Sequence, residues 1–226
     1  MEINFGDINL DIKEGLVTGI VGLSEQDFCF DKDFNYVDKA NFNVFIKKTV
    51  YDELKLAMGK NKKSLDNINS TIRDMMKMVG LNDSNLFDNP NNLSNGEKGL
   101  VSLARLLLND SGFIILKDIT CYLDDKSVSN LEKIIKKYKR DFNKTFVIIS
   151  DDIDFIYLIS DEMVIIDNSL VLFQGKKKDV YDRLKGEIRN VPLIIEFVSR
   201  VYNKKSIRLD KTSDVKELMK DVYRNV

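Results

Sequence analysis

The sequence contains no histidine and only two cysteines, Cys29 and Cys121. Without histidine, the chain lacks the side chain that most often moves protons near neutral pH and most often binds metals. Two cysteines fit neither a zinc site nor a disulfide framework, which favours a reducing compartment such as the cytoplasm. The sequence therefore argues against a metal site built from this chain's own residues and against a disulfide-linked secreted protein.

Long apolar runs and an excess of one charge are missing as well. No stretch has the length of a membrane span, and the first residues lack the pattern of a secretory signal. The 226 residues include 35 basic and 36 acidic side chains, and this net charge of −1 gives no general attraction to nucleic acid. We therefore expect a globular protein, 43% hydrophobic and 31% charged, without a nucleic-acid partner.

Residues 93–124 are the most informative stretch of the chain. Ser94 is followed three residues later by Glu97, the spacing of a helix capping box, and apolar residues then recur at helical spacing. Such a helix start offers free backbone N–H groups and the positive end of a dipole to an anion. A short apolar run then predicts a buried parallel strand that ends at Lys117 and Asp118.

This ordered stretch resembles the signature motif, the Walker B strand and the D-loop of ATP-binding-cassette (ABC) ATPases. The Walker B strand normally ends in Asp-Glu, where this chain has Lys117 and Asp118, and the D-loop resemblance ends on Asp124. The resemblance thus places Asp118 at the general-base position, as a shortened side chain that we expect to be inactive. The signature normally reads Leu-Ser-Gly-Gly followed by Gln or Glu, and the corresponding residues are Leu93, Ser94, Asn95, Gly96 and Glu97.

The family's phosphate-binding loop is replaced in this sequence. The loop normally reads G-x-x-G-x-G-K-[ST], and Gly22 resembles its first glycine. Glu25 and Asp27 stand at the later glycine positions, Phe28 stands at the lysine and Cys29 at the hydroxyl that holds Mg²⁺. Two unit charges about 4 Å apart repel by roughly 4 kcal/mol at an effective dielectric near 20, so carboxylates here oppose a triphosphate. We predict that this loop, with Gly22 as its remnant, binds no nucleotide in the family's way.

Other family motifs are replaced or kept in part. Lys39 aligns by spacing with the Q-loop glutamine, and Asp151 stands at the position of the switch histidine. Residues 49–54 closely resemble the T-V-x-[DE]-E-[LVI] run that follows the Q-loop in some ABC ATPases. The resemblance therefore implies docking to a membrane partner around residues 39–54. Arg105, on the helix of the signature, is expected to be structural.

The order of predicted elements indicates an α/β fold, a P-loop NTPase-like ABC ATPase core with a truncated N-terminal lobe. We assign the ATPase domain to residues 1–186, with a helical subdomain at about 51–108, and a small helical extension to residues 187–226. The extension, with Thr212 or Ser213 as the N-cap of its last helix, resembles that of energy-coupling-factor importer ATPases. Periodicity predicts strands at 3–12, 17–21, 113–116 and 145–149, a hairpin at 161–166 and 170–173, and helices at 51–58, 65–79 (capped by Gly80), 98–108, 127–138 and 192–201.

The resemblance implies a pseudo-ATPase in a membrane importer. In that interpretation ATP and Mg²⁺ bind only at a composite site, to which this chain contributes its signature motif and a partner its intact phosphate loop. The implied partners are an intact ABC ATPase subunit, forming a heterodimer, and a transmembrane coupling subunit, with the chain at the inner face of the cell membrane. Two alternatives stay open: a non-catalytic regulatory or scaffold protein that keeps the fold, and a decaying copy. The regular core periodicity argues mildly against decay.

Overall fold

The computed structural model of this protein describes residues 1–29, 35–38, 41–59, 65–180, 192–205 and 215–225. The chain divides into two compact units, Met1–Asp31 with Val147–Val226, and Lys32–Phe146. Lys39, Thr212 and Ser213 lie outside the described residues. The domain boundary at residue 186 also lies outside them and stays a prediction.

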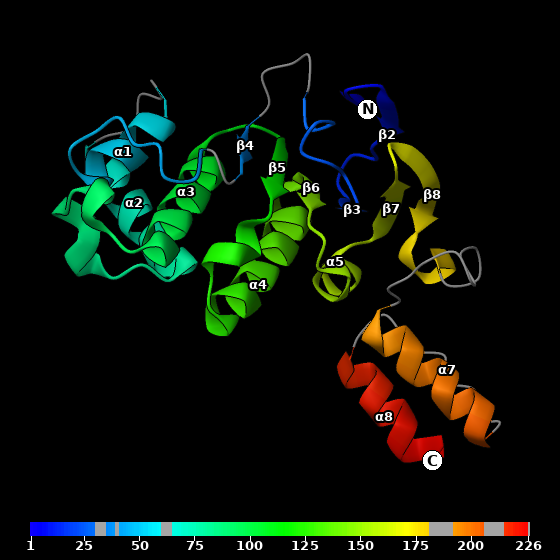
Figure 1. The fold of residues 1–226 in the computed structure, drawn as a ribbon. Helices are drawn as coiled ribbons and strands as arrows, with labels where there is room; N and C mark the ends of the chain where they lie inside the picture. The colour runs from blue at the N-terminus through cyan, green and yellow to red at the C-terminus, as the bar shows by residue number, and fades with distance from the viewer. Residues whose placement is uncertain (30–34, 39–40, 60–64, 181–191, 206–214, 226) are drawn as a thin grey trace. The chain divides into compact units, whose positions relative to one another are not determined.

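The first unit is built around a small mixed sheet (Figure 1). Strand β3 (Val17–Val21) pairs in parallel with β7 (Glu162–Asp167), and β7 pairs antiparallel with β8 (Leu170–Lys176). The turn between β7 and β8 places Asn168 at φ 48° and Ser169 at φ 60°, both in the left-handed region that a tight two-residue hairpin requires. The predicted strand at 17–21 and the predicted hairpin are therefore confirmed.

The N-terminal residues form a hairpin, where the sequence predicted one strand over residues 3–12. Strands β1 (Glu2–Phe5) and β2 (Ile8–Asp11) pair antiparallel, because Gly6 takes φ 57° and reverses the chain. The apolar spacing changes from two residues to three between Phe5 and Ile8, and both side chains are buried on either side of the turn. The prediction of a single strand was wrong, whereas the burial of its apolar residues is confirmed.

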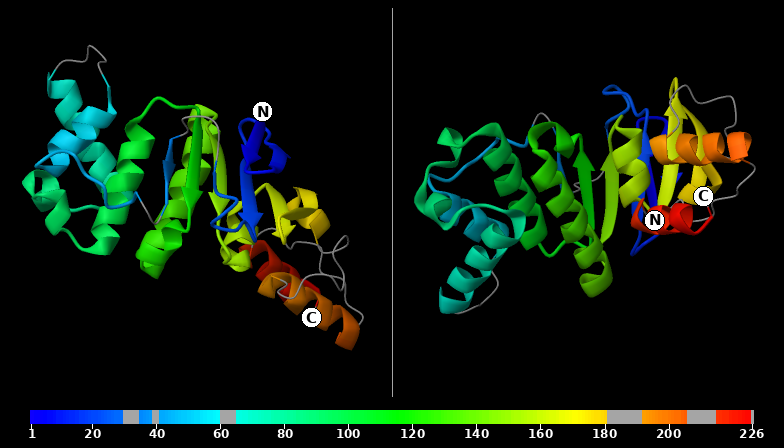
Figure 2. Two further views of the ribbon diagram at one scale, coloured as in Figure 1. Left: turned by 45° about the horizontal axis from the view of Figure 1, so that its top comes forward. Right: turned by 90° about the horizontal axis from the view of Figure 1, so that it is seen from below.

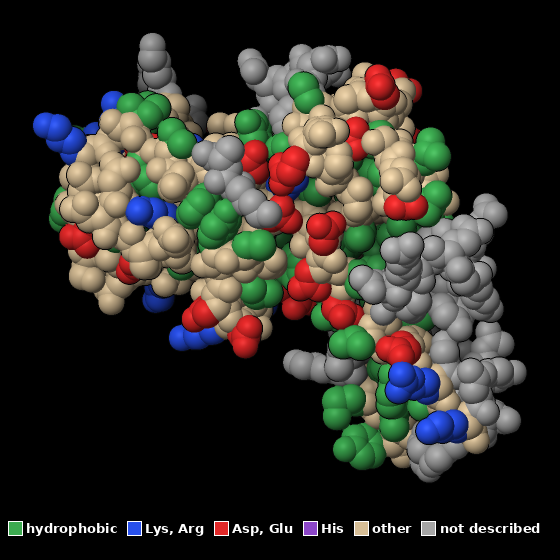
Figure 3. Space-filling view, viewed as in Figure 1, with side chains coloured by type: hydrophobic (Ala, Val, Ile, Leu, Met, Phe, Trp, Pro, Cys, Tyr) green, Lys and Arg blue, Asp and Glu red, His purple; other side chains and the backbone are tan. Residues whose placement is uncertain are grey.

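Helix α5 (Ile153–Ile159) was not predicted. It packs on β3, where Gly19 allows the close approach: a Cβ at this position would lie 2.2 Å from Ser160 Oγ. Helices α7 (Leu193–Lys205) and α8 (Val215–Asn225) follow at the C-terminal end. Figure 3 shows apolar side chains on the surface of this pair, and the large exposed ones are Leu193, Phe197, Met219 and Tyr223.

The described part of the second unit is mainly helical and includes the parallel strands β4 (Tyr36–Val37) and β5 (Phe113–Lys117). Helix α3 (Asn95–Leu108) packs against α1 (Val50–Ala57) and α2 (Leu65–Val79), and Figure 2 shows these helices together. Among the described residues of this unit, 3₁₀ turns connect the helices and strands at η1 (Asp83–Phe87), η2 (Pro90–Asn92) and η3 (Ile119–Tyr122).

Most predicted elements of the second unit are confirmed. Helix α2 has the predicted bounds and ends at Gly80, whose φ of 95° makes it the expected cap. Helix α4 (Asp125–Phe142) is longer than the predicted 127–138, because it is capped at its start by Asp124 and at its end by Asn143 in the left-handed region. Strand β6 (Thr145–Ile149) has the predicted bounds and continues the chain into the first unit.

Candidate functional site

The segment that replaces the phosphate loop begins at Gly22, directly after β3. Gly22 takes φ 83°, and a Cβ there would lie 2.1 Å from the carbonyl oxygen of Ile166, so the backbone requires glycine at this point. In residues 22–29 the chain forms turns and no helix. The free N–H groups and dipole of a helix start, which serve the family as an anion site, are therefore not formed within this segment.

The carboxylate of Asp27 accepts hydrogen bonds from a hydroxyl within the segment and from one in the turn between β7 and β8. Ser24 Oγ donates to Asp27 Oδ2 at 2.7 Å, and Ser169 Oγ donates to the same oxygen at 2.8 Å. The backbone N–H of Asp27 donates in turn to Ser24 Oγ at 3.1 Å. The hydroxyl of Ser24, followed by that of Ser169, lowers the pKa of Asp27 below its ordinary value. An ionised carboxylate thus stands at a position where the family has a glycine facing phosphate.

The last two residues of the segment contact the N-terminal hairpin. The ring of Phe28 stacks on that of Phe5 with centroids 6.3 Å apart, and Gly6 N donates to the carbonyl oxygen of Cys29 at 3.0 Å. In the family these two positions supply the lysine and the hydroxyl for ATP and Mg²⁺. Since here they carry a phenyl ring and a thiol, and Asp27 adds a negative charge, the residues present do not fit a magnesium triphosphate.

The residues at the switch position form the start of α5. Asp152 caps the helix, because its Oδ1 accepts from Phe155 N at 3.0 Å, and its own N–H donates to Ser150 Oγ at 3.1 Å. Ser150 N donates to the carbonyl oxygen of Ile20 in β3 at 3.1 Å. Asp151 lies between these residues and is exposed. The Ser-Asp-Asp sequence is thus explained by helix capping, a signal that the sequence analysis missed.

The signature motif forms the predicted capping box at the start of α3. Glu97 Oε2 accepts from Ser94 N at 2.9 Å and from Ser94 Oγ at 2.7 Å, and Glu97 N donates to Ser94 Oγ at 3.3 Å. The hydroxyl of Ser94 lowers the pKa of Glu97, and the backbone N–H of Ser94 adds to this effect. Asn95 is the first residue of the helix. The hydroxyl that the resemblance assigned to a partner's nucleotide is therefore hydrogen-bonded within its own helix.

The D-loop lies against the same helix start. A Cβ at Gly96 would lie 3.1 Å from the carbonyl oxygen of Tyr122, and Asp124 Oδ1 accepts from Ser127 N at 2.8 Å at the start of α4. The hydrogen bonds from Ser127 lower the pKa of Asp124. Close backbone packing therefore accounts for the glycine at position 96, and helix capping accounts for the aspartate at position 124.

The end of β5 carries the altered Walker B positions. Lys117 is buried, with 4% of its surface exposed, and Asp118 takes φ 51° at the start of η3. A lysine ammonium has no lone pair with which to bind a cation, so position 117 cannot supply the oxygen ligand that Mg²⁺ requires.

A buried ion pair that the sequence analysis missed joins α1 to α3. Glu53 is 2% exposed and accepts from Arg105 Nη1 at 3.0 Å, from Ile46 N at 3.0 Å and from Lys47 N at 2.8 Å. Arg105 also donates to the carbonyl oxygen of Val44 at 2.7 Å, which confirms its structural role. The pair fixes residues 44–47 against both helices. An acidic residue on the apolar face of a predicted helix was the signal that could have found it.

Comparison with known proteins places these features in context. Residues 27–120 match the family described as ABC transporter. The methionine import ATP-binding protein MetN of Clostridium tetani is 27% identical, with 83% of this chain and 71% of that protein covered. MetN of Ligilactobacillus salivarius is 30% identical over 66% of this chain, and the chain spans only 42% of its length.

Two solved structures share the fold. The dimeric bacterial ABC transporter cassette MJ0796 is 20% identical with a TM-score of 0.66, covering 78% of this chain and 98% of that one. The cbiO1 protein of Clostridium perfringens, part of the ABC transporter complex cbiONQ, is 21% identical with a TM-score of 0.61, covering 91% and 94%. None of the helices in the described residues is both long enough and apolar enough to span a membrane.

Proposed function

Because the chain belongs to the ABC transporter ATP-binding domains and is homologous to importer ATPases, we propose that it is a pseudo-ATPase subunit of a membrane importer. The family normally binds ATP and Mg²⁺. The observation that carries the proposal is the bonding of Asp27 by Ser24 and Ser169. These bonds keep a negative charge at a position where the family needs a glycine N–H for phosphate.

Phosphoryl transfer depends on positioning and on neutralising the phosphate charge. This chain carries Phe28 at the lysine position, Lys117 at a magnesium position and Asp118 at the general-base position. Two of these replacements remove a group that neutralises charge or binds the cation, and the third shortens the base. Its own site is therefore inactive in this proposal, and Asp118 has no catalytic role.

The retained signature motif supports a role at a partner's site. One similar structure is that of a cassette dimer bound to ADP and phosphate. In the proposed heterodimer, the N-terminus of α3, with Ser94, Asn95, Gly96 and Glu97, covers ATP held by the phosphate loop of an intact ABC ATPase subunit, and Asp124 belongs to the same interface. Asn95 places a side chain near that nucleotide and reduces the contribution of the motif.

We propose further that the chain docks to a transmembrane coupling subunit around residues 39–54, at the inner face of the cell membrane. The relatives named as import ATP-binding proteins support this assignment. The part of the region that the structure describes includes the start of α1, where Thr49 is the N-cap.

The test is ATP hydrolysis by the chain in complex with an intact ABC ATPase subunit. When turnover is stopped with the nucleotide trapped in the complex, each heterodimer should retain one nucleotide. Asn95→Gly should raise the hydrolysis rate, because it removes the side chain next to the partner's nucleotide. Asp118→Asn tolerates the left-handed backbone and should leave the rate unchanged. Two trapped nucleotides, or loss of hydrolysis in Asp118→Asn, would contradict a pseudo-ATPase.

A scaffold protein without any role at an ATP site is the second candidate. Local contacts favour it, because Ser94, Gly96 and Asp124 each have a structural partner within the second unit. The same complex separates the two candidates: a scaffold predicts that Asn95→Gly leaves the partner's hydrolysis unchanged.

A further inference from the structure

Strand β8 forms an outer edge of the sheet in the first unit (Figure 1). It pairs antiparallel with β7 on one side, and none of the other strands in the described residues pairs with it. The second side of β8 therefore presents its backbone N–H and C=O groups outward in the plane of the sheet. Such an edge is a template on which a further strand can pair.

The side chains of this edge strand are apolar and exposed. Leu170 is 67% exposed, Val171 is 40% exposed and Leu172 is 41% exposed. Residues 170–175 contain no charged residue and no proline, which are the residues that usually protect an edge from pairing. A short, uncharged segment of high β-propensity at an edge is therefore suited to strand pairing.

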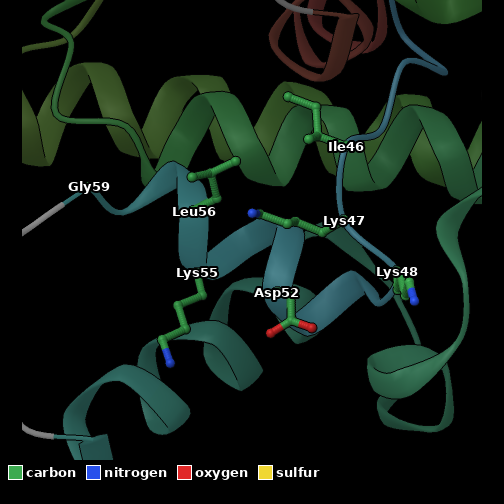
Figure 4. Close-up of a pocket in the computed structure, with 7 residues that line it drawn as sticks. All are labelled: Ile46, Lys47, Lys48, Asp52, Lys55, Leu56 and Gly59. Atoms are coloured by element: carbon green, nitrogen blue, oxygen red, sulfur yellow. The ribbon is translucent and has the colours of Figure 1, made fainter.

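Two exposed aliphatic residues of the second unit have different surroundings. Ile46 and Leu56 line a hollow of about 620 Å³ together with Lys47, Lys48 and Lys55 (Figure 4). Leu56 belongs to α1, and a helix makes its backbone hydrogen bonds within itself. The hollow thus offers no strand edge, and Leu56 provides a control for the exposed leucines of β8.

A β-bulge lies in the middle of the apolar segment. Val171 pairs with Ile166 and Phe173 pairs with Ile165, so Leu172 is an extra residue on β8. A bulge leaves the backbone of its extra residue outside the ladder and increases the twist of the strand. The backbone of Leu172 can therefore bond to a neighbouring strand, while the twist limits the pairing to a short stretch.

The exposed charges at the two ends of the edge have opposite signs. Asp167 precedes the apolar segment, and Lys176 and Lys178 follow it. When two identical strands pair antiparallel, the start of each lies beside the end of the other. A two-fold axis near Leu172 would thus place aliphatic side chains together and each Asp167 near the lysines of the other copy. The edge is complementary to itself, as an interface between two identical surfaces requires.

We propose that β8 pairs antiparallel with β8 of a second copy of this chain, across a two-fold axis near Leu172. The proposal does not depend on the pseudo-ATPase assignment, because the signature residues 93–97 take no part in the contact. One pair of short strands is a small interface, so the dimer dissociates in the micromolar to millimolar range.

The experiment is analytical ultracentrifugation of the whole chain without nucleotide, from about 10 µM to about 1 mM, where a weak dimer forms. Asp167→Lys alone, and Lys176→Glu/Lys178→Glu alone, should each weaken self-association about tenfold or more, because like charges then meet across the axis. An equimolar mixture of these two variants should associate again, since each then meets the opposite charge. A general loss of stability would not be reversed by mixing.

Cysteine cross-linking tests the position of the axis. In a chain with Cys29→Ser and Cys121→Ser, Leu172→Cys should form a disulfide-linked dimer under mild oxidation, because the two-fold axis brings the two copies of residue 172 together. Leu56→Cys in the same background is the matched control and should stay monomeric.

A monomer at every concentration, equal cross-linking of the two cysteine variants, or a mixture that associates no better than its components would overturn the proposal. Self-association that persists in Asp167→Lys but is lost in Phe197→Lys, on α7, would assign the contact to the C-terminal helices instead. Loss in Asn95→Arg with no effect of Asp167→Lys would assign it to the start of α3.

Discussion

Replacement of Arg105 by methionine tests how the chain holds residues 44–47. The change removes the guanidinium from Glu53, whose side chain is 2% exposed, and from the carbonyl oxygen of Val44. Removing one member of a buried ion pair typically costs about 3–5 kcal/mol, because the other charge is left without compensation. For this pair we expect a cost at the lower end of that range, because Arg105 is 31% exposed and Glu53 keeps its hydrogen bonds from the N–H groups of Ile46 and Lys47.

We therefore expect Arg105→Met to lower the free energy of unfolding by about 3 kcal/mol. Glu53→Gln should cost about 1.5 kcal/mol, because it removes one charge-assisted bond and Arg105 can still reach water. The double variant should cost less than the two single losses added together, since no buried charge is left alone.

The assay is urea unfolding combined with hydrogen exchange at the amides of Ile46 and Lys47, which report directly on the carboxylate. Arg73→Met is the matched control, because Arg73 and Asp83 form an exposed pair at 3.2 Å whose loss should cost at most about 1 kcal/mol. Equal destabilisation by Arg105→Met and Arg73→Met, with unchanged exchange at both amides, would refute the reasoning.

Two further predictions concern the remnants of the family motifs. Gly22→Ala should lower the free energy of unfolding by more than about 2 kcal/mol, because the position combines a positive φ with a collision between the new Cβ and the carbonyl oxygen of Ile166. The control Gly59→Ala, at φ 66° with open space around it, should lower it by only about 1 kcal/mol, and thermal unfolding measures both changes. Ser94→Ala should cost about 1 kcal/mol through loss of the N-cap. The pKa of Glu97 in the folded protein lies below its ordinary 4.5. The ionised carboxylate therefore stabilises the folded state fully above pH 4.5, and this stabilisation is lost as the pH falls through the folded-state pKa. Unfolding measured from about pH 7 to about pH 3 should therefore show the difference between the variant and the parent shrinking in acid to the part that the bond from Glu97 N to Ser94 Oγ contributes, and a constant difference would contradict the capping box.

Local patterns made much of the fold predictable from the sequence. The capping box of Ser94 and Glu97 and the glycine cap at Gly80 depend on residues a few positions apart, so their spacing in the chain is sufficient. The hairpin of β1 and β2 was missed because the prediction treated residues 3–12 as one alternating run, although the apolar spacing changes at Gly6 and Asp7. Helix α5 was missed because the residues around Asp152 resemble a family motif and also cap a helix.

The bonds that define the candidate site join residues far apart in the chain. Asp27 accepts from Ser169, 142 positions later, and Glu53 binds Arg105, 52 positions later. A pattern within one segment can indicate one member of such a pair, as the acidic Glu53 on the apolar face of α1 does, but it does not identify the partner. The sequence predicted the charge that Asp27 brings to the loop, but not the two hydroxyls that hold it ionised and in place.

Binding of ATP to the purified chain, with Mg²⁺ and by isothermal titration calorimetry, tests the central claim most directly. The bonded carboxylate of Asp27, together with Phe28 and Cys29, predicts no binding at millimolar nucleotide. Binding in the micromolar range would contradict this account of the loop and would mean that the chain holds nucleotide through other contacts.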